Sequence, residues 1–259
     1  MKILCVFYGI GRGIESSEKS IISKLIKPIK KLGHSFSSIY ILNEINNVSN
    51  KRSGDYGPIG KVKNDAFKTN KIIRVKEDIL LNEDLYKLSR TYEDRHNDDY
   101  VSNKNLLCQL EMLRLSTEHS NFSNYDRVIF CRDDLLFQKR SINWKKVLEI
   151  SSKSSIVSCW GWHNGISERF LISPTSHAFK LATRIVLVKK CMKAYKRLNG
   201  EELMHFSFNY HDLYPVAVNI KTWRVRLGGR LQNERFNIAF WRPKEVSRLF
   251  FAVLRYYFH

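Results

Sequence analysis

The first part of the chain alternates between a continuous apolar run and apolar residues at helical spacing. Residues 3–8 (ILCVFY) are all apolar, which is typical of a parallel strand buried on both faces. Residues 21–32 then follow helical spacing, with Pro28 expected to bend this helix and Gly33 to end it. Strand-like residues 34–42 come next. The pattern predicts a strand, helix, strand unit, the basic element of a parallel sheet.

A second buried strand is predicted near the middle of the chain. Residues 125–131 (YDRVIFC) have the composition of such a strand, and Arg132, Asp133 and Asp134 follow it directly. In open α/β sheets, ligands bind beyond the carboxyl ends of the strands. We therefore expect this charged tip to face a ligand.

The remaining residues continue the alternation of strands and helices. The polar stretch 43–70 is long for a connection within one domain, so it is expected to be either functional or disordered. We predict an α/β fold with a mixed, mostly parallel central sheet flanked by helices. Apolar spacing places further helices at 80–88, 106–115, 144–150, 176–198 and 201–208, and strands at 71–75, 156–160, 169–173 and 218–227.

Composition adds a strong positive charge to this picture. Of the 259 residues 43% are hydrophobic, which is enough for one substantial core. Lysine and arginine number 44 against 25 acidic residues, so the formal net charge is +19. Nucleic acid, an anionic membrane or a phosphate-bearing substrate would be attracted by such a charge. Because the basic residues are scattered and no helix-turn-helix, zinc-finger or RNP-like motif occurs, we expect no nucleic acid partner.

Cysteines and apolar segments bear on location. The five cysteines are widely spaced and form no CxxC pair, which favours a reducing compartment over a disulfide framework or a zinc ribbon. No apolar run is long enough for a signal-peptide core or a membrane span. Residues 246–259 combine apolar residues with arginines. This segment is expected to be either a helix packed on the domain or an amphipathic tail that lies on an anionic membrane. We expect a cytoplasmic protein, with peripheral attachment to the inner face of the cytoplasmic membrane in the second case.

Four segments also carry a resemblance to a known family. The first is residues 6–12 (VFYGIGR), and the second is a helix at 109–115 followed by a strand and its charged end at 125–137 (YDRVIFCRDDLLF). The third is residues 161–174 (GWHNGISERFLISP), and the fourth is residues 200–203 (GEEL) with the later strand 224–226 (RVR). In order and spacing they resemble GT-A-type glycosyltransferases of bacterial and viral gene clusters for capsule and lipopolysaccharide synthesis. The resemblance implies a single GT-A, Rossmann-like domain over residues 1–259.

By this resemblance, the chain is expected to move a sugar from a nucleotide diphosphate donor to a bacterial surface glycan, lipid-linked or free, in lipopolysaccharide, O-antigen or capsule synthesis. Negative charge gathers on the departing diphosphate, and a divalent cation held by carboxylates can stabilise it. Asp134 matches the acidic position of the family and Asp133 precedes it, so this pair is the expected ligand set for manganese or magnesium. The pair is not a strict Asp-x-Asp, and a solvated turn is the alternative interpretation.

Arginine and glycine are further candidates for donor binding. Arg12, Arg132 and Arg169 lie at expected strand ends, where a bidentate guanidinium can hold a phosphate without a metal ion. Gly9, Gly11 and Gly13 would let the backbone approach the nucleotide closely, or would only provide a tight connection into the first helix.

A transfer that inverts the anomeric centre needs a carboxylate to remove a proton from the acceptor hydroxyl. Glu168 and Glu202 are the expected catalytic residues, and Glu201 is a further candidate. In the family an aspartate is usual at the position of Glu168. For Glu201 and Glu202, favourable charge at a helix amino terminus is the alternative interpretation.

Other conspicuous residues have mainly structural interpretations. His163, His211 and Asp212 are expected to be polar residues satisfied by local hydrogen bonds. Trp160 and Trp162 either stack on a sugar ring or belong to the core. Two rival functions stay open, a basic nucleic-acid-binding protein and a non-catalytic scaffold of a glycan assembly complex.

Overall fold

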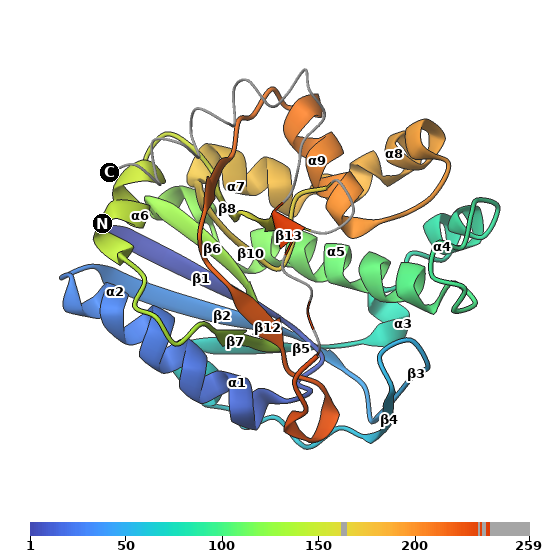
Figure 1. The fold of residues 1–259 in the computed structure, drawn as a ribbon, viewed down its shortest axis with the longest axis horizontal. Coiled ribbons are helices and arrows are strands. Elements are labelled where there is room, and N and C mark those ends of the chain that lie inside the picture. The colour runs from blue at the N-terminus through green and yellow to red at the C-terminus, as the bar shows by residue number, and fades with distance from the viewer. Residues whose placement is uncertain (162–164, 233, 235–236, 239–259) are drawn as a thin grey trace.

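Seven strands form the central sheet of the computed structural model, which describes residues 1–161, 165–232, 234 and 237–238 (Figure 1). Strand β1 is parallel to β2 and β6, and β2 is parallel to β5, whereas β10 is antiparallel to β6 and β8. This sheet, flanked by helices, confirms the predicted α/β fold class. Across the sheet the order is β11 (Val216–Val218), β8 (Ile156–Ser158), β10 (Phe170–Pro174), β6 (Arg127–Arg132), β1 (Lys2–Gly9), β2 (Ser35–Glu44) and β5 (Lys71–Lys76).

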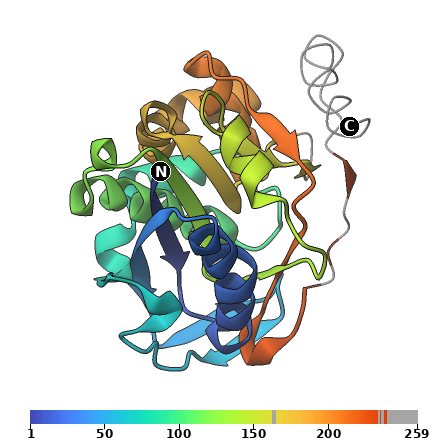
Figure 2. The ribbon, with the colours of Figure 1, turned by 90° about the vertical axis from the view of Figure 1, so that its left-hand side faces the viewer.

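Strand β1 is buried on both faces, which explains its continuous apolar run. Ile3, Cys5 and Phe7 face one core layer, and Leu4 and Val6 face the other. Such a strand has no solvent side, so every position is apolar. The first layer is covered by α1 (Ile14–Ile21), α2 (Lys27–Lys31) and α6 (Trp144–Ile150), and the second by α5 (Val101–His119), α7 (Thr175–Ala182) and α9 (Gly200–Tyr210) (Figures 1 and 2).

The first helix contains a π-helical turn just before Pro28. The chain runs from α1 through this turn, η1 (Ile22–Ile26), directly into α2. Proline has no N–H to donate to the carbonyl of Lys24, and the indole Nε1 of Trp144 donates to that carbonyl at 2.7 Å instead. A side chain from α6 thus compensates for the proline, and Gly33 follows the helix end with φ 79°, as predicted.

The polar stretch 43–70 forms a hairpin and a short turn. The hairpin consists of β3 (Asn47–Asn50) and β4 (Asp55–Pro58), and the turn is η2 (Ala66–Lys68). Phe67 in this turn is fully buried and stacks on Phe7 of β1, with 4.5 Å between ring centroids. The stretch is thus folded against the sheet, and its hairpin borders a cavity at the edge of the sheet.

Most predicted helices are present with changed bounds. The expected helix 80–88 is two helices, α3 (Glu77–Leu80) and α4 (Glu83–Ser89), because Asn82 caps the second by accepting a hydrogen bond from the N–H of Leu85 at 3.0 Å. Helix α6 has the predicted bounds, and α5 is longer than predicted. The expected helix 176–198 is divided into α7, η4 (Arg184–Leu187) and α8 (Val188–Tyr195).

The prediction of a single strand at residues 218–227 is wrong. The structure instead has two short strands. Strand β11 belongs to the central sheet and ends at Val218, and β12 (Thr222–Arg224) pairs antiparallel with β7 (Leu135–Phe137). Alternation in the sequence cannot show that successive residues are buried against different partners. The smaller elements are η3 (Phe122–Asn124), β9 (Trp160–Gly161), which pairs with β13 (Asn237–Ile238), and η5 (Leu227–Gly229).

Some expectations from the sequence concern residues that the structure does not describe. Those for Trp162, His163 and the amphipathic tail 246–259 lie outside the described residues. All five cysteines are described, and each is buried as a free thiol. Within the described part of the chain, no helix combines the length and apolar character that crossing a bilayer requires.

Candidate functional site

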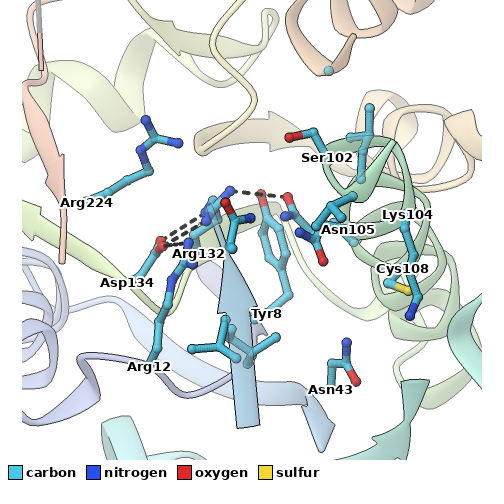
Figure 3. A pocket seen from close by; sticks show the side chains of 18 of the residues that line it. Tyr8, Arg12, Asn43, Ser102, Lys104, Asn105, Cys108, Arg132, Asp134 and Arg224 are labelled. Carbon is cyan, nitrogen blue, oxygen red and sulfur yellow. Dashed lines mark hydrogen bonds and ion pairs between the residues drawn. The ribbon is translucent and has the colours of Figure 1, made fainter. Parts of the chain in front are cut away.

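A cavity of about 490 Å³ lies at the carboxyl ends of β1, β2 and β6 (Figure 3). Gly9, Asn43 and Asp133 line it from these three strand ends. Helix α5, the hairpin β3–β4, the start of α9 and the segment 224–226 complete its wall. The position at the carboxyl edge of parallel strands is the one expected for a ligand site in an open α/β sheet.

Asp133 is turned toward the backbone after β1. Its Oδ2 accepts hydrogen bonds from the N–H of Gly11 at 2.7 Å and from the hydroxyl of Tyr40 at 2.6 Å. A Cβ on Gly9 would lie 2.0 Å from Oδ1 of the same carboxyl, so only glycine fits there. Burial, and then the charge of Asp134, raise the pKa of Asp133 to about 7. The Asp133 carboxyl therefore holds the turn that shapes one wall of the cavity.

Asp134 is paired with two arginines. Arg132 donates to its two carboxylate oxygens from Nε at 2.9 Å and from Nη2 at 2.7 Å, and Arg12 donates from Nη2 at 3.2 Å. Burial alone would raise the pKa of Asp134, but the charges of Arg132 and Arg12 outweigh burial and hold this pKa well below its usual range. Asp134 is therefore ionised, with both oxygens engaged.

The two expected metal ligands do not fit a divalent cation in this arrangement. Magnesium and manganese are bound by carboxylate oxygens. Both oxygens of Asp134 already accept from Arg12 and Arg132, and Oδ2 of Asp133 already accepts from Gly11 and Tyr40. Among the described residues, no group of three or more His, Cys, Asp or Glu side chains is placed to hold a metal ion. The donors on the wall suit an anion better than a cation.

Arginines from distant parts of the chain gather at this cavity. The expected residues Arg12, Arg132 and Arg169 all line it, together with Arg224 and Arg226 from the segment around β12. The side chains of these five are at most 16% exposed. The sequence signal for the last two was the motif RVR at 224–226, which places arginines two residues apart on one face of a strand.

Buried carboxylates hold these arginines in place. Asp55 of the hairpin lies 3.0 Å from Nη1 of Arg12 and 3.6 Å from Nη1 of Arg226. Glu234 lies 2.8 Å from Nε of Arg224 and 3.1 Å from Nη1 of Arg169. Neither carboxylate was singled out from the sequence, because nothing local distinguishes them from solvent-exposed acids.

Glu168, expected to be catalytic, lines the cavity. Its carboxylate lies against Gly200 at the start of α9, where a Cβ would be 2.3 Å from Oε2. Glu201 lines the same cavity. Burial, and then the charge of Glu201, raise the pKa of Glu168 above its usual value. A carboxylate with a raised pKa in a cavity is suited to accept a proton near neutral pH.

Glu202, the other expected catalytic residue, has a different environment. It is buried and ion-paired with Arg95 and Arg197, and it is not among the described residues that line the cavity. The backbone N–H of Glu202 donates a hydrogen bond to Oδ1 of Asn199, the N-cap residue of α9, at 3.1 Å. Successive helix residues point about 100° apart, so Glu201 can face the cavity while Glu202 faces the ion pairs. The geometry therefore favours Glu201 over Glu202 for a role in the cavity.

Two buried amides in the wall were not expected from the sequence. The side chains of Asn43 and Asn103 are almost fully buried and line the cavity. Oδ1 of Asn43 and Nδ2 of Asn103 have no hydrogen-bond partner among the described residues. An unpaired buried polar group is costly, so these atoms are well placed to bond a ligand.

The remaining sequence candidates lie elsewhere. Trp160 donates from Nε1 to Asn219 at 2.9 Å, and Nζ of Lys221 lies 3.9 Å from the centre of one of its rings. Within the described chain, Trp160, His211 and Asp212 do not line the cavity.

Comparison with known proteins identifies the fold. No protein-family model and no curated protein sequence matches the chain. Core-mannan synthase A of Aspergillus fumigatus, in its Mn/GDP form, is similar with a TM-score of 0.50 and 10% identity over 86% of this chain and 74% of that one. Mouse xyloside xylosyltransferase 1, in its apo form, is similar with a TM-score of 0.45 and 9% identity over 84% and 85% of the two chains. The likeness to the mannan synthase supports the GT-A-type fold.

Proposed function

We propose that this chain is a glycosyltransferase that transfers a sugar from a nucleotide diphosphate donor to a glycan acceptor. The observation that carries the proposal is the arginine-lined cavity at the carboxyl ends of β1, β2 and β6. A GT-A-type fold with a site for an anion at that edge suits such a donor. The unpaired amides of Asn43 and Asn103 suit the hydrogen-bonding groups of a nucleotide.

The proposed transfer assigns proton acceptance to Glu168. The acceptor hydroxyl oxygen attacks the anomeric carbon, and the bond from that carbon to the diphosphate oxygen breaks with its electron pair on the diphosphate. The hydroxyl proton passes to the carboxylate of Glu168, whose raised pKa suits this role. Glu201 supplies the negative charge that helps to raise that pKa.

A divalent cation has no assigned step in this proposal. The mannan synthase structure is described as an Mn/GDP form, and manganese or magnesium was the cofactor expected from the sequence. In this chain the carboxylates of Asp133 and Asp134 already have other partners. The departing diphosphate is therefore assigned to the arginines of the wall.

The acceptor that we propose is a bacterial surface glycan of the lipopolysaccharide, O-antigen or capsule type, lipid-linked at the inner face of the cytoplasmic membrane. The sequence resemblance and the charge of +19 support this location. Lys189, Lys190 and Lys193 of α8 are exposed, and Val186 beside them is 70% exposed. Basic side chains around an exposed apolar residue suit the surface of an anionic bilayer.

The test is a screen of nucleotide sugars by thermal unfolding, followed by measurement of nucleoside diphosphate released with glycan acceptors. We expect at least one nucleotide sugar to raise the Tm. We expect Glu168→Gln to lower kcat by about a hundredfold or more while donor binding is retained. If no nucleotide sugar binds and the protein is retained on DNA in a salt-dependent way, the nucleic-acid rival is correct. Donor binding by wild type without any turnover would favour the scaffold.

A further inference from the structure

The cavity wall offers hydrogen-bond donors where a metal-dependent site would offer carboxylate oxygens. The carboxylate of Asp134 binds the fork of Arg132 through Nε and Nη2, and it also accepts from Arg12. Figure 3 shows Asp134 joined to Arg12 and Arg132 by dashed lines, with Arg224 on the same side of the cavity. The carboxylate thus faces guanidinium groups rather than open space.

Several N–H donors of these arginines remain for a ligand. Arg224 uses Nε for Glu234, and its Nη donors have no protein partner among the residues described. Arg12 uses Nη1 and Nη2 for Asp55 and Asp134, and its buried Nε has no partner in that same part of the chain. Guanidinium groups held by carboxylates are preorganised for phosphate oxygens, because their orientation is fixed before the ligand arrives.

The charges that line the cavity also favour an anion over a cation. The residues lining the cavity include seven Lys or Arg and five Asp or Glu. Burial and then the charge of Arg224 lower the pKa of Arg169 to about 10, and the same two causes lower that of Arg226 to about 9. The arginines of the wall therefore repel one another. A divalent cation would add to this repulsion, whereas a diphosphate would relieve it.

We infer that the cavity binds the diphosphate of its donor directly through Arg12, Arg132 and Arg224, without a divalent cation. Asp134 is then a positioning residue that holds Arg12 and Arg132 for this contact. The inference rests on the proposed function, and it departs from the manganese or magnesium site that the sequence predicts at Asp133 and Asp134.

Calorimetric titration of the full chain with GDP, UDP and inorganic pyrophosphate tests the inference. Each titration is made in excess chelator and again with manganese. We expect the tightest of the three probes to bind in chelator with an affinity within about threefold of that with manganese. Arg224→Gln should weaken binding in chelator by about tenfold to about a hundredfold, the usual effect of losing a charge-assisted hydrogen bond.

Two further variants make this titration specific. Arg224→Lys keeps the charge without the fork, so intermediate affinity is expected if the fork matters. Arg114→Gln removes an equal charge from α5, where Arg114 pairs with Glu111 and Glu118 and does not line the cavity; it should bind like wild type. The thermal unfolding of each variant shows whether it is folded.

The outcomes separate the inference from the proposed function. Binding that requires manganese and is lost in chelator overturns the inference and leaves the proposed function standing. A folded Arg224→Gln variant with wild-type affinity also overturns it. If none of the three probes binds under either condition, both the inference and the proposed function fail.

Discussion

Asp133 and Asp134 are neighbours in the chain, yet their carboxyl groups have opposite surroundings. Asp133 accepts from uncharged donors on Gly11 and Tyr40, whereas Asp134 accepts from two guanidinium groups. The pKa of Asp133 is raised to about 7 and that of Asp134 is held well below its usual range. Local sequence shows two acids at a strand end, but partners brought in by the fold determine which one is ionised.

The raised pKa of Asp133 predicts a stability change with pH. Because the folded state binds this proton more tightly than the unfolded state, the stabilisation is full below the unfolded value of 3.8 and is lost as pH rises through about 7. It amounts to at most about 4 kcal/mol. Asp133→Asn keeps an acceptor for Gly11 and Tyr40 but cannot titrate, so its free energy of unfolding should depend less on pH in this window.

Denaturant unfolding of wild type and Asp133→Asn, at steps from pH 4 to pH 8, measures the difference. Asp134 should not contribute to the difference measured between pH 4 and pH 8. Because its pKa is lowered in the folded state, its contribution to the free energy of unfolding is lost only as pH falls below the unfolded-state pKa of 3.8. Parallel curves for the two proteins would show that Asp133 does not titrate in this range.

Glu168, Glu201 and Glu202 provide a second prediction at the residue scale. Glu168→Gln should lower kcat by about a hundredfold or more, since it removes the proposed proton acceptor. Glu201→Gln should move the acid limb of the kcat/KM profile to lower pH, because a negative charge that raises the pKa of Glu168 is gone. A purely structural role for Glu201 would leave that limb in place.

Glu202→Gln is the matched control for this pair. It breaks the ion pairs with Arg95 and Arg197, so the free energy of unfolding should fall by about 1–3 kcal/mol. The pH profile should stay unchanged, because Glu202 is not part of the described cavity wall. A shifted profile in this variant would return Glu202 to the catalytic candidates.

At the scale of elements, Asp55 joins the hairpin β3–β4 to two distant segments. Besides Arg12 and Arg226, it accepts from the N–H of Leu227 at 3.2 Å and from the hydroxyl of Ser53 at 2.8 Å. The hairpin is a wall of the cavity, so one buried carboxylate positions it relative to the arginines.

We therefore predict that Asp55→Asn weakens both the hairpin and the site. Loss of the buried charge leaves Arg12 and Arg226 without this counterion, at a cost of about 3 kcal/mol or more in unfolding free energy. Limited proteolysis should then cleave faster within residues 47–58, and nucleotide affinity should fall. Asp65→Asn, an exposed acid near η2, should change neither quantity.

The predicted elements show where sequence patterns were sufficient. Strands β1 and β6 were predicted because burial on both faces leaves an unbroken apolar run inside each strand, at residues 3–8 and 128–131. The hairpin β3–β4 was not predicted as strands, because its residues are polar and its position depends on Asp55 and distant arginines. The two strands β11 and β12 were merged for a similar reason, since their partners lie far away in the chain.

At the scale of the whole molecule, the charge of +19 has to be divided between the cavity and the surface. The arginines of the cavity are engaged with Asp55, Asp134 and Glu234, whereas the lysines of α8 face solvent. Only the exposed charges are available to a membrane, and salt screens them.

We predict binding to vesicles of anionic lipid that weakens as salt is raised. The double variant Lys189→Glu with Lys193→Glu should lower vesicle affinity by at least about tenfold, since each basic residue at the surface contributes about 1 kcal/mol. The double variant Lys27→Glu with Lys153→Glu makes the same charge change at exposed sites outside α8. An equal loss of vesicle affinity in the two double variants would contradict a specific role for α8. Vesicle binding that does not depend on the content of anionic lipid would contradict it as well.

By itself, the sequence determined the fold class, the buried strands and the place of the charged tip after β6, because these follow from which faces of local elements are apolar. Only the tertiary structure decided what the charged residues do. Folding brings together four residues that are at least 43 positions apart in the chain, namely Arg12, Asp55, Asp134 and Arg226. Glu201 and Glu202 are adjacent in the sequence, yet Glu201 lines the cavity and Glu202 forms ion pairs. The ionisation and partners of a side chain depend on the groups that folding places around it, and those groups leave no local signal in the sequence.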